Sequence, residues 1–175
     1  PISEINDKFN KKIEGENDVL LKIFDPFRAK DYMGKERLSF NNRIQLCEES
    51  FENEIRIYTD FMKHNEAFGP NETINIPTIS KSGFITLTTE TGLYQFCGLY
   101  IAMQNLGKEK PSSEKDFENG EKQLKLIHRS NIIHGDIRLA NMFKFNEKFY
   151  FIDYGFSSDV FAINCDSSQN GDKID

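Results

Sequence analysis

Polar side chains suited to phosphoryl transfer are concentrated between residues 128 and 158, in the stretch HRSNIIHGDIRLANMFKFNEKFYFIDYGFSS. Asn141 lies five residues after Asp136, and Asp153 lies 17 residues after Asp136. Phosphoryl transfer requires one carboxylate that orients the attacking hydroxyl, and Mg²⁺ prefers hard oxygen ligands such as carboxylate and amide oxygens. Asp136 fits the first role, and Asn141 and Asp153 fit the second.

Phosphoryl transfer also requires a cation that binds the phosphates of ATP, and Lys22 in the strand-like segment VLLKIF can supply it. Each of these residues has a simpler explanation when taken alone. A strand lysine usually faces solvent, Asp136 could cap a helix, and Asn141 or Asp153 could form a turn. Their order along the chain and the elements that carry them favour a shared site.

The segment IIHGDIRLAN, followed by FIDYG, resembles the catalytic and metal-binding loops of the protein kinase-like superfamily, whose usual patterns are H-R-D-x-x-x-x-N and D-F-G. The glycine in H-G-D resembles the variant found in aminoglycoside phosphotransferases, in RIO-type atypical kinases and in divergent fungal kinase-like proteins. The resemblance implies that Asp136 orients the acceptor hydroxyl and that Asn141 and Asp153 bind Mg²⁺. It also implies that Arg138 reaches the transferred phosphate, since a guanidinium can neutralise the charge that develops there.

His134 has a supporting role in this resemblance. A histidine at this place in the family packs against the metal-loop residue, which is Tyr154 here, and bonds to the backbone. We therefore do not assign His134 as a base.

The resemblance extends to the N-terminal half. Lys22 is similar to the strand lysine that contacts the α- and β-phosphates, and its expected partner is a glutamate on the next helix. Glu54 is the first choice because it lies on the apolar face, three residues after Phe51 and one before Ile55. A carboxylate there is costly unless it is paired. Glu48 is the second choice.

The segment LYIAMQNLG resembles the strand that leads into the kinase hinge. The backbone of Met103, Gln104 and Asn105 is then expected to bind the adenine edge. The cofactors implied are ATP and Mg²⁺, and the acceptor is a hydroxyl on a protein or a small molecule.

The hydrophobic pattern predicts the elements that must position these residues. A hairpin over 8–14 and 18–24 precedes a loop or poorly defined helix over 25–42, and a further helix runs from about Ile44 to a break at Gly69. Two strand-like segments, 82–90 and 93–103, lead into a helix over 113–130 that starts at a Ser113 cap and turns Phe117 inward. A second hairpin forms around FNEK.

These elements predict an α+β, two-lobed, protein kinase-like fold, with a small antiparallel N-terminal sheet plus one helix and a reduced, mainly helical C-terminal lobe. The expected divisions are an N-terminal lobe over 1–103, a hinge over 104–107, a C-terminal lobe over 108–160 and a polar tail over 161–175.

Charge, cysteine content and hydropathy narrow the partners and the cellular location expected of the protein. The chain has 175 residues with a net charge of −6, which argues against a nucleic-acid partner. Its three cysteines form no CxxC pair, as expected in a reducing compartment. No apolar run approaches the roughly 20 residues needed to cross a bilayer. We expect a soluble, intracellular protein, cytoplasmic or nuclear, without a membrane partner.

Two departures from the family pattern keep the function open. Residues 1–21 contain a single glycine, Gly15, so no G-x-G-x-x-G precedes Lys22. The 22 residues given after Asp153 show no visible activation segment. The chain is expected to be a fragment or a reduced kinase-like domain. Besides an ATP- and Mg²⁺-dependent phosphotransferase, a pseudokinase or nucleotide-binding scaffold without turnover fits these observations. An α+β interaction domain with chance motifs is a third reading.

Overall fold

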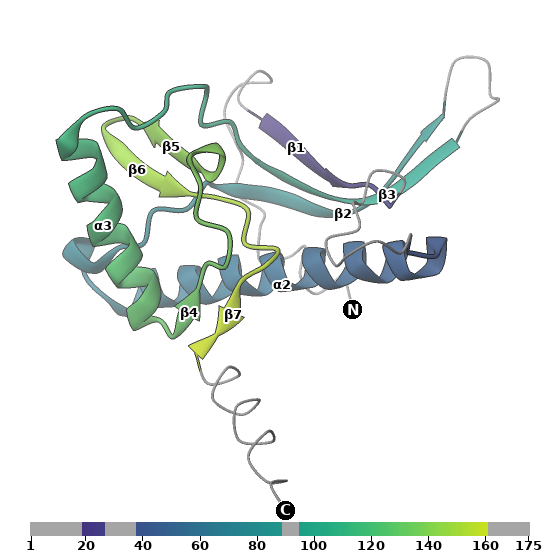
Figure 1. The fold of residues 1–175 in the computed structure, drawn as a ribbon, viewed down its shortest axis with the longest axis horizontal. Coiled ribbons are helices and arrows are strands. Elements are labelled where there is room, and N and C mark those ends of the chain that lie inside the picture. The colour runs from purple at the N-terminus through teal and green to yellow at the C-terminus, as the bar shows by residue number, and fades with distance from the viewer. Residues whose placement is uncertain (1–18, 27–37, 89–94, 161–175) are drawn as a thin grey trace, which may run out of the picture. The chain divides into compact units, whose positions relative to one another are not determined.

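The computed structural model describes residues 19–26, 38–88 and 95–160. The chain divides into two compact units, unit 1 (Pro1–Glu52 and Pro77–Asn105) and unit 2 (Asn53–Ile76 and Leu106–Asp175). The elements are β1 Val19–Phe24, α2 Phe40–Ala67, η2 Pro70–Glu72, β2 Ile79–Thr88, β3 Gln95–Gln104, α3 Glu114–Arg129, β4 Ile132–Ile133, η3 Leu139–Asn141, β5 Met142–Phe145, β6 Lys148–Phe151 and β7 Ser158–Asp159 (Figure 1). The predicted lobe limits stay predictions. The boundary between Asn105 of unit 1 and Leu106 of unit 2 falls inside the expected hinge over 104–107.

Unit 1 is built on a three-stranded antiparallel sheet in the order β1-β3-β2. In this register Lys22 pairs with Ile101. The Phe24 ring packs edge-on against Phe51 of α2, with 5.5 Å between the ring centroids. The first part of α2 therefore packs against the sheet face that carries Phe24. The strands predicted over 18–24, 82–90 and 93–103 are confirmed where the structure describes them.

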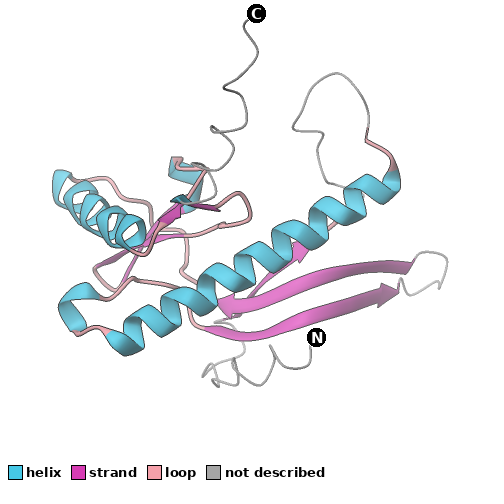
Figure 2. Ribbon diagram, turned by 90° about the horizontal axis from the view of Figure 1, so that it is seen from below, coloured by secondary structure: helices cyan, strands magenta, loops and turns pink. Residues whose placement is uncertain are grey.

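Helix α2 is a single long helix (Figure 2) that begins one turn earlier than predicted. It starts at Phe40 because Ser39 caps it. The Ser39 hydroxyl accepts the Asn42 N–H at 3.2 Å, and the Ser39 carbonyl accepts the Arg43 N–H at 3.1 Å. The segment over 25–42, predicted as a loop or a poorly defined helix, is therefore helical from Phe40 onward, and α2 ends before Gly69 as predicted.

Unit 2 contains α3, whose start is confirmed as a capping box between Ser113 and Asp116. The expectation that Phe117 turns inward is wrong, because this side chain is 50% exposed. Gly120 is buried in its place, and a Cβ there would lie 2.8 Å from the Phe149 ring. The helix needs a glycine at this position so that Phe149 of β6 can pack directly against its backbone.

The predicted second hairpin is confirmed as β5 and β6, which pair antiparallel with Met142 opposite Phe151. Its two-residue turn consists of Asn146 and Glu147, both with left-handed backbone angles (φ 48° and 60°). Two-residue hairpin turns favour such angles because they match the twist of the strands. The hairpin separates the segment that carries Asp136 from the one that carries Asp153.

Several expectations lie outside the described residues: the strand over 8–14 with Gly15, most of the segment over 25–42 and the tail over 161–175. Over the ranges that are described, we find no helix with the length and apolarity that crossing a membrane requires.

Candidate active site

The catalytic loop of unit 2 joins three of the predicted site residues directly. Asn141 Nδ2 donates to the Asp136 carboxylate at 2.9 Å and to the Asp136 carbonyl at 3.0 Å. Arg138 Nε forms an ion pair with the same carboxylate oxygen, Oδ2, at 3.1 Å. Two donors on one oxygen hold the Asp136 side chain in one orientation. Because the Asn141 amide nitrogen faces Asp136, the amide oxygen of Asn141 is directed away from it.

The residue before Asp153 ties the metal loop to the catalytic loop. The Ile152 N–H donates to the Asn141 carbonyl at 3.0 Å, which continues the β5–β6 pairing by one step. The Ile152 carbonyl lies 3.1 Å from His134 Nε2. Asp153 follows at the open end of the hairpin, with a left-handed φ of 70°. The structure thus brings Asp153 to the same end of the hairpin as Asn141.

His134 is fully buried and neutral, as its hydrogen bonds require. Its Nδ1 accepts the Asp136 N–H at 3.3 Å, so the proton lies on Nε2 and is donated to the Ile152 carbonyl. Burial lowers the pKa of His134, and the Ile152 carbonyl, Asp153 and Asp136 offset part of this effect. The ring lies 4.7 Å from that of Tyr154. The predicted supporting role of His134, with its backbone bond and its contact with Tyr154, is confirmed.

Burial distinguishes Glu54 from the other candidate glutamates of α2. Glu54 is fully buried, whereas Glu48 is exposed. Burial and the Glu54 charge raise the pKa of both Tyr58 and Tyr154. The Tyr154 ring packs edge-on against Tyr58 and Phe61, at 5.5 and 5.2 Å. Glu54 therefore lies within the aromatic cluster around the metal loop, and its predicted pairing with a cation stays a prediction.

Gly135 explains the H-G-D form of the catalytic loop. It has a left-handed φ of 78°, and a Cβ at this position would lie 2.2 Å from the carbonyl oxygen of Phe156. No side chain fits so close to a backbone atom. The catalytic loop and the segment after Asp153 are thus in direct contact at Gly135.

Lys110 holds the backbone around Asn141, a role that the sequence did not reveal. Its Nζ donates to the carbonyls of Ala140 and Met142 at 2.9 and 3.1 Å and lies 3.3 Å from the centre of the Phe143 ring. Burial lowers the pKa of Lys110. A single lysine in a polar connector gives no sequence signal for such a contact.

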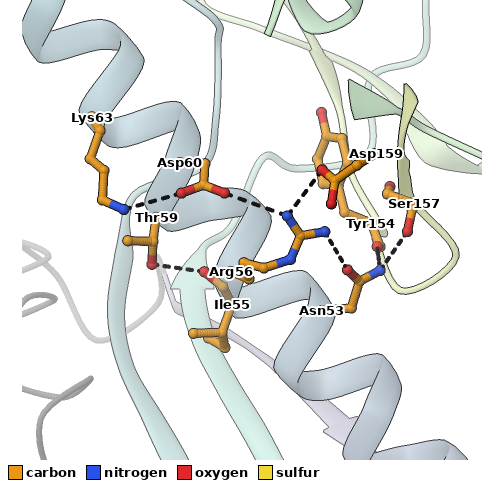
Figure 3. A network of polar contacts seen from close by, with 9 residues as sticks. All are labelled: Asn53, Ile55, Arg56, Thr59, Asp60, Lys63, Tyr154, Ser157 and Asp159. Atoms are coloured by element: carbon orange, nitrogen blue, oxygen red, sulfur yellow. Dashed lines mark hydrogen bonds and ion pairs between the residues drawn. The ribbon is translucent and has the colours of Figure 1, made fainter. Parts of the chain in front are cut away.

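A second interaction missed from the sequence involves Asn53 of α2. Its Nδ2 lies within hydrogen-bonding distance of the carbonyls of Tyr154 and Ser157, at 3.2 and 2.7 Å (Figure 3). It also lies 3.2 Å from the Gly155 carbonyl. Asn53 directly precedes Glu54 but does not belong to the apolar stripe that defines the buried face of the helix. Its partners lie about 100 residues away in sequence, so only the fold could reveal the contact.

The remaining predicted residues belong to unit 1. Lys22 is half-buried, and its Nζ lies 5.1 Å from the centre of the Phe24 ring. Among the hinge residues Met103 is buried, Gln104 is half-buried and Asn105 is exposed. Because Lys22 and Glu54 fall in different units, their pairing is not established by either unit alone.

The donor set in unit 2 fits Mg²⁺ better than a softer metal. In the described ranges no three His, Cys, Asp or Glu side chains are grouped as a metal site. Asp153 and the amide oxygen of Asn141 are hard ligands, and Mg²⁺ commonly takes one or two protein ligands and completes its shell with water and phosphate oxygens. These two residues therefore fit a Mg²⁺–nucleotide complex.

No protein-family model and no curated protein matches the chain. Two solved structures of WbdD, a bifunctional kinase-methyltransferase, are similar to it with TM-scores of 0.51 and 0.52, both at 15% identity. The matches cover 81% of this chain but only 29% and 28% of those chains, so it spans less than a third of their length. At this identity the likeness shows the fold alone. The chain has an α+β fold of the protein kinase-like type.

Proposed function

We propose that the protein is an ATP- and Mg²⁺-dependent phosphotransferase that transfers the γ-phosphoryl group to a hydroxyl of a protein or a small molecule. One observation carries the proposal: the hydrogen bonds that link Asp136, Asn141 and Ile152 bring the catalytic and metal loops to one end of the hairpin. A protein with no chemistry at this place has no need to fix the Asp136 carboxylate with the Asn141 amide and to join the two loops by backbone hydrogen bonds.

The geometry of the side chains supports a role for each residue. Asp136 has Oδ2 engaged by Asn141 and Arg138, and we propose that its Oδ1 accepts the hydrogen of the acceptor hydroxyl. The hydroxyl oxygen bonds to the γ-phosphorus, the bond to the β–γ bridging oxygen breaks, and ADP leaves. Arg138 is 58% exposed and can turn toward the transferred phosphoryl group, where it neutralises charge.

The nucleotide is bound by further residues of the predicted site. Asn141 and Asp153 would hold Mg²⁺, which neutralises phosphate charge when it is bound. We propose that Lys22 binds the α- and β-phosphates, that Glu54 orients Lys22, and that the backbone of Met103, Gln104 and Asn105 binds adenine. These assignments rest on the resemblance to kinases and on the half-buried position of Lys22.

Thermal unfolding with ATP, with and without Mg²⁺, tests nucleotide binding. We expect a Mg²⁺-dependent rise in melting temperature in the wild type that is lost in Asp153→Ala, because a ligand of the native state stabilises it by mass action. Glu121→Gln is the control, since it removes one negative charge from an exposed pair on α3. No rise in the wild type would refute nucleotide binding.

Turnover of ATP separates the enzyme from a scaffold without turnover. Asp136→Asn keeps the shape of the side chain but removes the carboxylate that accepts the proton. We expect this variant to bind ATP·Mg²⁺ as the wild type does and to lose at least about a hundredfold in turnover, the usual contribution of general base catalysis. Wild-type binding without turnover would favour the scaffold, and an unchanged rate in Asp136→Asn would exclude Asp136 from the proposed role.

A further inference from the structure

Asn53 faces the backbone that directly follows the predicted metal ligand Asp153. Its amide group lies 2.7 Å from the Ser157 carbonyl and 3.2 Å from those of Tyr154 and Gly155. An amide NH₂ has two hydrogens, so three carbonyls share two donors. The contact therefore engages most of the carbonyl groups in the first turn after Asp153.

The orientation of this amide is fixed from its other side. Asn53 Oδ1 accepts a hydrogen bond from Arg56 Nη2 at 2.9 Å, and Arg56 Nη1 lies 3.2 Å from Asp159 and 3.5 Å from Asp60 (Figure 3). The reverse orientation would direct the amide oxygen at three carbonyl oxygens. Arg56 thus selects the orientation in which Asn53 donates.

The segment that Asn53 holds begins at a residue with an uncommon backbone angle. Asp153 has a left-handed φ of 70°, which few residues with a side chain adopt, although aspartate tolerates it better than most. After it, the Ser157 N–H closes a turn on the Tyr154 carbonyl at 3.0 Å, and the Ser157 hydroxyl donates to the His134 carbonyl at 2.9 Å. Asn53 joins this turn to α2 by hydrogen bonds, in addition to the ring contacts that Tyr58 and Phe61 make with Tyr154.

We propose that Asn53 is a positioning residue that holds Asp153 in the orientation required to bind the Mg²⁺–nucleotide complex, an inference that rests on the proposed function. Asn53 does not touch the reacting atoms. It fixes three carbonyls of the turn after Asp153, so the left-handed angle at Asp153 is retained before the metal arrives. Loss of Asn53 lets the turn relax, and binding of Mg²⁺ must then supply the ordering.

The test compares Asn53→Leu with Asn65→Leu in the intact protein. Both residues lie on α2, and the Asn65 side chain also bonds to backbone, at the Ile74 N–H and carbonyl (2.8 and 2.9 Å). Both changes replace an amide by an apolar group of similar size. They differ in that only Asn53 contacts the turn after Asp153.

Mg²⁺ titrations at saturating ATP, followed by the melting temperature, give the first readout. We expect the Mg²⁺ concentration at half effect to rise about tenfold in Asn53→Leu, as the loss of one or two hydrogen bonds predicts. It should stay within about twofold of the wild type in Asn65→Leu, whatever that variant loses in stability.

Hydrogen exchange without nucleotide gives a second readout. The Ser157 amide should exchange faster in Asn53→Leu than in Asn65→Leu, because its acceptor Tyr154 is no longer held. Equal effects of the two variants on both readouts would overturn the proposal. If the wild type binds no Mg²⁺–nucleotide complex, both the proposed function and the positioning role are refuted. This result is distinct from the one in which the wild type binds the complex and the two variants bind it equally well, which refutes the positioning role alone.

Discussion

Replacement of Gly135 by alanine should destabilise the protein through two separable effects. The residue has a φ of 78°, and a new Cβ would lie 2.2 Å from the Phe156 carbonyl oxygen. The left-handed angle costs a residue with a Cβ about 1–2 kcal/mol, and reduced freedom of the unfolded chain returns about 0.4–1 kcal/mol. Forcing the Phe156 backbone away adds about 1–3 kcal/mol, as in other overpacked sites. At mid-range these effects give an expected loss of about 3 kcal/mol.

Two other glycines isolate these effects. Gly107 has a similar φ of 72°, but a Cβ there would meet open space, so Gly107→Ala should lose only about 1 kcal/mol. Gly69 has an ordinary φ of −75° and also faces open space, so Gly69→Ala should stay within about 0.5 kcal/mol of the wild type. The three variants therefore form a series in which angle and contact are added one at a time.

Urea unfolding of the series measures the free energy of unfolding directly. With a slope of about 2 kcal/mol per molar urea, the midpoint should fall by about 1–2 M in Gly135→Ala and by about 0.5 M in Gly107→Ala. Equal shifts in these two variants would show that the approach of Phe156 to Gly135 contributes nothing. The H-G-D sequence would then need an explanation other than the contact between the two loops.

Three further changes test other contacts. Ser113→Ala should lower the free energy of unfolding by about 1 kcal/mol, measured in urea, because it removes the acceptor for the Asp116 N–H; no loss would exclude the cap as a stabilising feature. Because the pKa of His134 is lowered in the folded state, the unfolded state binds the proton more readily below about pH 6.5, so stability falls as the pH is lowered from neutral. In His134→Gln the urea midpoint should therefore depend less on pH between 7 and 5 than in the wild type. The same pH dependence in both proteins would contradict this. Lys110→Met keeps the apolar stem but loses two backbone hydrogen bonds and the contact with the Phe143 ring, so about 1–2 kcal/mol should be lost in the same assay, and an unaltered midpoint would refute a holding role.

Local patterns were sufficient to predict most elements. The paired apolar runs on either side of FNEK predicted the β5–β6 hairpin, and the Ser113–Asp116 pair predicted the start of α3. The step of three and four residues in α2 predicted that Glu54 lies on its apolar face, where it is fully buried. These features depend on neighbours in sequence, which a pattern can detect.

The errors and omissions have a common physical origin in contacts between distant segments. Glycine disfavours a helix interior by its propensity, yet the close approach of Phe149 makes Gly120 necessary there, and Phe117 is exposed instead of buried. The contacts of Lys110 and Asn53 with backbone carbonyls leave no pattern in the sequence, because a carbonyl is present at every residue. The site assignments from Lys22 to Asp153 stay predictions until nucleotide binding is measured.

The distance along the chain between Asn53 and its partners has a consequence for how the protein folds. Asn53 and Ser157 are 104 residues apart, whereas the two strands of the β5–β6 hairpin are joined by a two-residue turn. Contacts between distant residues close large loops and form slowly, while local hairpins form early. We expect Asp136 and Asn141 to meet before Asp153 is fixed, so that a newly made chain acquires its metal site last. Pulse-labelling of amides during refolding should show protection of Ser157 after that of the hairpin, and simultaneous protection would contradict this order.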